Sequence, residues 1–280
     1  MLPEHPLHCL LRGLRTQLPA VMSTLTLALL KREAPRNVRR WRNTLAEVAN
    51  ILVPIYGTPN LGNYRDPVKE IYYILLSAKT TEELYRAAYR RLWRRFSTLR
   101  KLAEATVPQI RSCIEGAGLG AKRAKQVKQI AQRLLADFGP KASRSLRRMP
   151  SAEAYRYLVA LPGVGPKSAL CVLMYCLDTD VFPVDANVQR ILFRMGGIPA
   201  GSKHYRAQQL LPAYVPEGLS RALHVVLVIH GRTVCRPMNP ACVECPIRRL
   251  CKTGQRTKTP GTTSALGRRS GIGGSAERSS

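Results

Sequence analysis

Two polar residues, Lys167 and Asp185, stand where their chemistry could be activated by the start of a helix. Lys167 occupies the second position of an apolar segment that Pro166 opens, and proline favours the first position of a helix. Free amides at a helix start disfavour a further positive charge, so we expect a lowered pKa for this lysine. Such an amine is a candidate nucleophile, and a lysine that binds phosphate is the alternative.

Asp185 follows the apolar run 181–184 and precedes a periodic apolar segment that ends at Gly196. The ordinary role of an aspartate at this position is to cap the helix. A carboxylate held by helix amides also stays ionised. It could then stabilise a developing oxocarbenium ion or help to move a proton, so both roles remain open at this point.

Four of the eight cysteines lie close together near the C-terminal end of the chain, with the spacing C-x6-C-x2-C-x5-C: Cys235, Cys242, Cys245 and Cys251. Disulfide frameworks are typical of small secreted domains with little core, which this chain is not. Zinc ribbons usually pair two short C-x2–4-C motifs, and only one is present. The unequal gaps favour a [4Fe-4S] cluster, with zinc as the alternative.

The charge balance points to a polyanionic partner. The 280 residues include 45 Lys plus Arg and 17 Asp plus Glu, a net charge of +28. Half of the excess, +14, lies within the stretch 86–148, more than in the two tails together, which indicates a basic folded surface suited to nucleic acid. No apolar run approaches the roughly 20 residues needed to cross a bilayer, so a membrane-spanning protein is excluded. An acidic protein such as a calcium buffer is excluded as well.

The two ends of the chain read as basic tails. Residues 1–31 loosely imitate a signal peptide, but no cleavage site of small residues follows, so we expect an intracellular, reduced protein that could start at Met22. We expect a basic, partly disordered extension over residues 1–40. The Gly-, Ser- and Arg-rich segment 253–280 predicts a disordered basic tail.

The elements that must position these residues are helical, and no convincing alternating strand pattern occurs, so the fold class is all-α. The expected helices are an apolar stripe over 45–52, a helix opened by Asp66, one opened by Thr81 that runs to Phe96, and one around 127–135. Each of them has apolar residues at helical spacing.

The most informative stretch, 151–177, predicts two helices joined by a tight turn. Ser151 is expected to cap the first helix, and the turn contains Gly163, Val164 and Gly165. Glycines let the backbone approach a phosphate, and the amides of the turn and of the next helix can bind it. An ordinary turn between helices is the alternative, but the basic charge favours a helix–hairpin–helix that binds DNA.

The hairpin segment LPGVGPK, the segment FPVDANV around Asp185 and the cysteine spacing occur in that order, and together they closely resemble the endonuclease III family of helix–hairpin–helix DNA glycosylases. The resemblance runs from about Trp41 to Cys251 and implies two lobes. One would be a six-helix barrel over 66–179, with the helix–hairpin–helix at 151–177. The other would be an iron–sulfur lobe formed by 41–65 plus 180–252, and DNA would bind between the lobes.

The resemblance also implies an activity: base excision repair by a bifunctional DNA N-glycosylase and AP lyase that acts on damaged pyrimidines. It makes Lys167 the Schiff-base lysine and Asp185 the essential carboxylate, and it assigns a [4Fe-4S] cluster to the four cysteines. The expected partner is double-stranded DNA with damaged bases or abasic sites, bound by a monomer inside the cell, in the cytoplasm or nucleoid if the source is bacterial.

Several departures from the family pattern keep alternatives open. Lys79 stands where the family usually has the Gln that fills the gap left by an extruded base, and it could change lesion choice or contact a phosphate. Ala186 replaces the usual Thr, and the segment FPVD is similar to the plant 5-methylcytosine glycosylases. A mismatch-specific adenine glycosylase is disfavoured because that branch lacks the hairpin lysine. A non-catalytic damage-binding or redox-sensing iron–sulfur protein is the third possibility.

Overall fold

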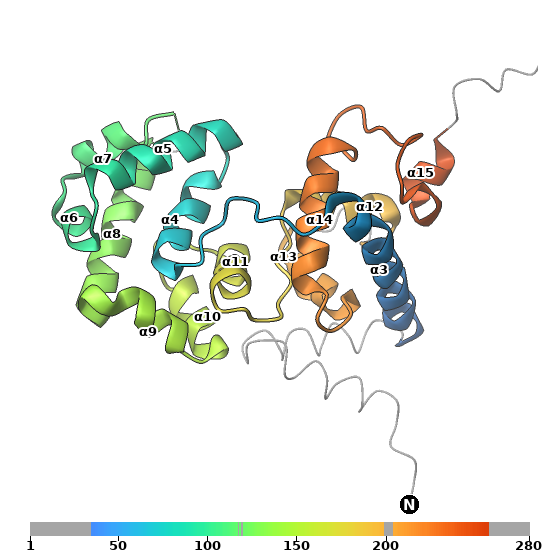
Figure 1. Ribbon diagram of the computed structural model, residues 1–280, viewed down its shortest axis with the longest axis horizontal. Coiled ribbons are helices and arrows are strands. Elements are labelled where there is room, and N and C mark those ends of the chain that lie inside the picture. The colour runs from blue at the N-terminus through green and yellow to red at the C-terminus, as the bar shows by residue number, and fades with distance from the viewer. Residues whose placement is uncertain (1–34, 117, 119, 199–203, 258–280) are drawn as a thin grey trace, which may run out of the picture.

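The computed structural model describes residues 35–116, 118, 120–198 and 204–257, and these form helices and connecting loops (Figure 1). No strand occurs among the residues so described, which confirms the all-α fold class. The first 34 residues, Met22 among them, and the tail from residue 258 lie outside the described part of the chain. None of the helices that can be described is both long and apolar enough to cross a membrane.

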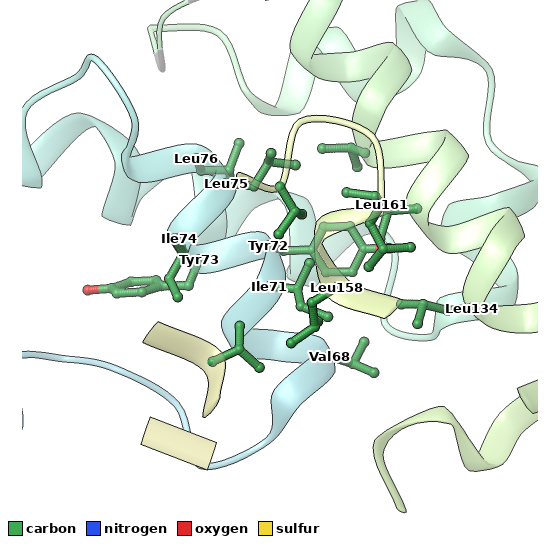
Figure 2. Packing of buried hydrophobic residues seen from close by; sticks show 14 of the residues in the cluster. Val68, Ile71, Tyr72, Tyr73, Ile74, Leu75, Leu76, Leu134, Leu158 and Leu161 are labelled. Carbon is green, nitrogen blue, oxygen red and sulfur yellow. The ribbon is translucent and has the colours of Figure 1, made fainter. Parts of the chain in front are cut away.

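The first hydrophobic core is surrounded by consecutive helices on the left of Figure 1. They are α4 (Pro67–Ser77), α5 (Glu82–Arg95), α6 (Leu99–Glu104), α7 (Val107–Cys113), α8 (Gly120–Phe138), α9 (Ala142–Arg148), α10 (Ser151–Val159) and α11 (Pro166–Cys176), with a 3-10 turn at Gly139–Lys141. The central helix is α4, whose apolar residues lie all round its axis because neighbouring helices cover it. Figure 2 shows Tyr72 pointing into this core beside Leu158 and Leu161, while Tyr73 points to the opposite side of α4.

The second hydrophobic core joins the beginning of the described chain to its C-terminal third (Figure 1, right). It is formed by α3 (Pro35–Tyr56), α12 (Ala186–Met195), α13 (His204–Leu210), α14 (Ser220–Thr233) and α15 (Lys252–Arg256), with 3-10 turns at Leu211–Tyr214 and Arg248–Leu250. Trp41 and Leu45 of α3 are buried in it, and Trp41 stacks on Tyr214 with ring centroids 6.0 Å apart.

Several helices begin where local capping chemistry predicts. Asp66 caps α4 by accepting a hydrogen bond from the Lys69 amide at 2.9 Å, and Pro67 takes the first helical position. Ser151 is an exception, because Pro150 is the N-cap of α10 and Ser151 is the first helical residue. Its Oγ lies 3.0 Å from Thr179 Oγ1, so the Ser151 hydroxyl forms a hydrogen bond with a residue outside the helix instead of capping it.

The described residues include a short helical part of each expected tail. Residues 35–40 belong to α3, and Val38 is buried in the second core, where the sequence suggested an extension. Residues 253–256 complete α15 at the start of the expected disordered tail. In both places packing against the second core orders residues whose composition alone suggests a solvated segment.

Two connecting segments join the cores, and Asp178 ties them together. Asp178 forms an ion pair of 3.1 Å with Arg65, a residue that precedes α4, and one of 3.2 Å with Arg221 of α14. Its φ of 47° is left-handed, a conformation that costs energy for a residue with a side chain. The segment 177–185, which follows α11, carries Asp185 from one core to the other.

Candidate active site and cysteine site

An open pocket of about 870 Å³ lies where the two cores meet, and both Lys167 and Asp185 line it. Lys167 comes from α11 in the first core, and Asp185 precedes α12 in the second. Glu82 of α5 and Arg232 of α14 also line the pocket and form an ion pair of 2.8 Å from one core to the other. The structure therefore brings together the two residues that the sequence singled out, with a shared space between them.

Asp185 is held in place by the helix that it caps. Its Oδ1 accepts a hydrogen bond from the Val188 amide at 2.8 Å, and its Oδ2 accepts one from Asn187 Nδ2 at 3.0 Å. Burial alone would raise the pKa of this carboxyl, but His224, the Val188 amide and Lys167 favour the ionised form more strongly and lower it. Asp185 is therefore a carboxylate at neutral pH, as its position in the sequence predicts.

Lys167 does not have the lowered pKa that its place at a helix start suggests. Burial disfavours its ammonium form, but interactions with Cys171, Asp185 and Glu70 outweigh that effect and raise the pKa. The sequence-based expectation is wrong because it considers only the amides at the helix start. It omits Cys171, one turn further along α11, and the carboxyl groups of Asp185 and Glu70, which come from other elements of the fold. In the free protein Lys167 is an ammonium ion, which must lose a proton before it can attack.

Glu70 is a second carboxyl group near Lys167, and no sequence motif singles it out. It lies on α4 with none of its surface exposed, and it accepts hydrogen bonds from Asn63 Nδ2 and, at 2.7 Å, from the Tyr64 amide. Burial raises the pKa of Glu70 to about 7. Since Asn63 also lines the pocket, Glu70 anchors part of the pocket wall from behind.

His224 of α14 is a further pocket residue that sequence reasoning missed, since a single histidine in an apolar helix is usually part of the core. It is 3 % exposed, and its Nδ1 lies 2.9 Å from the Pro183 carbonyl oxygen. Burial lowers the pKa of His224 to about 4, so the ring is neutral at physiological pH. Because a carbonyl can only accept, Nδ1 carries the hydrogen and donates it to Pro183.

The hairpin turn divides its tasks among three residues. Gly163 has a φ of 81°, and a Cβ there would lie 2.5 Å from Gln126 Nε2, so the fold itself requires glycine. The Val164 side chain is buried, and its amide donates to the Leu161 carbonyl at 3.1 Å, inside the turn. Gly165, the N-cap of α11, has open space where a Cβ would lie, so a ligand could approach the backbone closely there.

Lys79 lies at the wall of the same pocket, two residues after the end of α4. Its φ of 58° is left-handed, which is unusual for a residue with a long side chain. The backbone of the loop before α8 approaches it closely, since a Cβ at Gly118 would lie 3.0 Å from the Lys79 carbonyl oxygen. Such a backbone conformation is often found at functional positions.

The four cysteines of the C-terminal segment line one small cavity beside α12 and α14. Arg194 Nη1 donates to Cys235 Sγ at 3.2 Å, His230 Nε2 lies 3.5 Å from Cys245 Sγ, and the Gly254 amide donates to Cys251 Sγ at 3.4 Å. Within the described residues, no three His, Cys, Asp or Glu side chains are arranged to hold a single metal ion.

Residues 73–217 match the family described as "HhH-GPD superfamily base excision DNA repair protein". The match spans more than half of the chain, which therefore belongs to this superfamily of helix–hairpin–helix base excision repair proteins. Within it, the chain is an endonuclease III-like DNA glycosylase and AP lyase. The family, the fold class and the enzyme class inferred from the sequence motifs are thus confirmed.

Curated relatives and solved structures support this assignment. Endonuclease III of Thermotoga maritima is 28 % identical over 191 residues, which are 68 % of this chain and 85 % of the relative. Endonuclease III of Bacillus subtilis is 25 % identical over 198 residues, or 71 % and 86 % of the two chains. The structure of a non-covalent endonuclease III–DNA complex shares the fold with a TM-score of 0.68, at 20 % identity, over 76 % of this chain and 96 % of that one.

Proposed function

We propose that this enzyme removes damaged pyrimidines from double-stranded DNA and then cleaves the strand through a Schiff base on Lys167. The observation that carries the proposal is the pocket between the two cores, which both Lys167 and Asp185 line. A damaged base must leave the stack before any side chain can reach its sugar, and an open pocket of this size gives an everted nucleotide room.

The proposed reaction begins when the Lys167 amine attacks C1′ of the deoxyribose as the bond to the damaged base breaks. Lys167 must first lose a proton, and the departing base needs a proton to leave as a neutral molecule, so one can supply the other. The Asp185 carboxylate stabilises the positive charge that develops on the sugar. The C1′–O4′ bond then breaks, O4′ takes a proton, and the opened sugar is held to Lys167 as a protonated imine. The imine acidifies the 2′ protons, and loss of one of them expels the 3′ phosphate, which breaks the strand on the 3′ side of the lesion.

The hairpin is the proposed contact with the DNA backbone. The first amides of α11 have no partner within the helix, and Gly165 leaves space beside them, so a phosphate can bind at this helix start. A net charge of +28 adds a sequence-independent attraction to DNA, which must weaken as salt is added. Lys79, on the pocket wall, is proposed to contact the DNA beside the extruded nucleotide.

We propose that Cys235, Cys242, Cys245 and Cys251 hold a [4Fe-4S] cluster. In such a cluster each thiolate binds a different iron atom, so the sulfur atoms need to surround a cavity and not to meet at one point. Zinc requires four sulfur atoms about 2.3 Å from a single ion. The four cysteines line one cavity, and the unequal gaps between them in the sequence favour the cluster over zinc. Its role would be structural, since it would fold the segment 235–251 against α12.

Borohydride trapping tests the proposed chemistry directly. The protein is incubated with duplexes that contain thymine glycol, an abasic site or adenine opposite guanine, and the imine is reduced to a stable adduct. We expect an adduct with the first two duplexes that disappears in Lys167→Ala and persists in the control Lys69→Ala, whose side chain is exposed on α4. Cleavage of the adenine mismatch alone would favour a mismatch glycosylase, and tight binding without an adduct would refute the lyase.

The metal is tested on the purified protein by its colour and by elemental analysis. A cluster predicts a brown protein with about four iron atoms per chain. Cys242→Ser should lose both the iron and the colour, whereas Cys113→Ser, a change at a buried cysteine in the other core, should retain them. A colourless wild-type protein that contains one zinc ion per chain would refute the cluster.

A further inference from the structure

The segment that carries Asp185 is buried, yet it belongs to no helix or strand. Phe182 and Val184 are 1 % and 0 % exposed, and the chain between them is extended. Buried backbone amides and carbonyls must find partners, because leaving one without a hydrogen bond costs about 1–3 kcal/mol. In this segment the partners are two buried side chains from other elements.

Gln208 of α13 supplies the first pair of hydrogen bonds. Its Oε1 accepts from the Val184 amide at 2.9 Å, and its Nε2 donates to the Phe182 carbonyl at 3.0 Å. Gln208 is only 4 % exposed, although glutamine is usually a surface residue. Its amide group offers a donor and an acceptor side by side, so it binds this stretch of backbone as a neighbouring strand would.

His224 supplies the third hydrogen bond, from Nδ1 to the Pro183 carbonyl at 2.9 Å. A proline has no amide hydrogen, so its carbonyl is the one backbone group at this position that can be held. Each of the three residues that precede Asp185 therefore has a backbone group bound by a buried side chain. Asp185 follows immediately and caps α12 through the Val188 amide.

We propose that Gln208 and His224 are positioning residues that fix the path of Phe182, Pro183 and Val184 and so hold the Asp185 carboxylate opposite Lys167. The inference rests on the proposed role of Asp185 in the reaction. It requires neither Gln208 nor His224 to touch the DNA. A displacement of about 1 Å in a catalytic group can cost on the order of 100-fold in rate, so this backbone support bears on turnover as well as on folding.

Two substitutions of His224 distinguish the role of its hydrogen bond from Nδ1 to Pro183, here called the tether, from any role of Nε2. In His224→Asn the side-chain Nδ2 can take the place of Nδ1 and still donate to Pro183. In His224→Gln the amide lies further out, near the place of Nε2, and the tether is lost. We expect His224→Asn to stay within about threefold of the wild-type rate of adduct formation, and His224→Gln to fall by roughly 10- to 100-fold.

Gln208 is tested by a similar comparison along α13. Gln208→Met keeps the approximate length of the side chain but removes both hydrogen bonds to the backbone. Gln209→Met makes the same change at the next residue, which no hydrogen bond links to the 181–185 segment. We expect the first variant to form the adduct at least tenfold more slowly and the second to match the wild type.

The rate constant is measured under single-turnover conditions with saturating enzyme on a thymine glycol duplex, so that departure of the base, the step assigned to Asp185, is part of the reaction. The temperature is kept well below the melting temperature of each variant. The affinity for an uncleavable abasic analogue is measured alongside. We expect the rate to fall in the tether variants while the affinity changes less than twofold, a split that a loss of folded protein would not produce.

Several results would overturn the inference. Equal rates in His224→Asn and His224→Gln would show that the bond to Pro183 is not used, and an active His224→Gln with an inactive His224→Asn would transfer the role to Nε2. If the wild type forms the adduct and Asp185→Asn does so equally fast, the role proposed for Asp185 fails, and the positioning argument falls with it. A wild type that forms no adduct refutes the proposed function itself.

Discussion

The buried carboxyl of Glu70 should make the stability of this protein depend on pH in a way that one substitution can isolate. Glu70 is fully buried on α4, and no salt bridge of a described residue compensates it. Its two hydrogen bonds, from Asn63 and the Tyr64 amide, do not offset the loss of water, and the pKa rises from 4.5 to about 7. The folded protein therefore binds this proton more tightly than the unfolded chain does.

The sign and size of the effect follow from this difference in pKa. A group with a raised pKa in the folded state contributes its stability fully below pH 4.5, and the contribution is lost as the pH rises through 7. At about 1.4 kcal/mol for each pH unit, the loss amounts to about 3 kcal/mol. Glu70→Gln removes the titrating carboxyl group but keeps the size of the side chain. The unfolding free energy of this variant should therefore lack the pH-dependent contribution of Glu70.

Urea unfolding of the wild type and of Glu70→Gln at several pH values between 4.5 and 8.5 measures the effect. The difference in unfolding free energy between the two proteins should shift by about 3 kcal/mol in favour of the glutamine variant as the pH rises. Other groups with altered pKa values, such as His224, are present in both proteins and cancel. A difference that stays constant within about 1 kcal/mol over this range would refute the assigned burial of the charge.

Three further perturbations test other parts of the structure. Gly163→Ala should lower the melting temperature, because the residue has a left-handed φ and an added Cβ would clash with Gln126. Gly165→Ala should melt at the wild-type temperature but bind duplex DNA more weakly in a fluorescence titration. Equal DNA affinity in Gly165→Ala and the wild type would count against the hairpin contact. Leu45→Ala, at a side chain with no exposed surface, should cost about 2–5 kcal/mol in urea unfolding, and a cost below about 1 kcal/mol would contradict its place in the second core. Lys79→Gly should stabilise the fold by about 1 kcal/mol, because glycine adopts a positive φ without strain. The same variant should form the adduct more slowly on duplexes with thymine glycol. Unchanged stability would contradict backbone strain at Lys79.

What the sequence predicted well depends on neighbours along the chain. The helix starts at Asp66 and Pro166 and the helix end at Gly196 need no more than the few residues around them, and all three occur as expected. Lys167 and Asp185 were found because each stands at a helix start inside a recognisable motif.

What the sequence did not predict depends on contacts between distant segments. The hydroxyl of Ser151 is taken by Thr179, and the raised pKa of Lys167 is due partly to Asp185 and Glu70. Gln208 has no local signature at all, since its importance comes from two backbone groups more than 20 residues away. Periodicity and capping rules describe one helix at a time and hold no information about such pairs.

The position of α3 has a consequence for how the chain folds as it leaves the ribosome. Its apolar face, with Trp41 and Leu45, belongs to a core whose other members follow residue 180. The helices of the first core are continuous in sequence, from α4 to α11, and can assemble as soon as they emerge. During synthesis the apolar face of α3 therefore remains exposed until α12 and α14 have been translated. We expect this interval to be the stage at which a nascent chain most needs a chaperone.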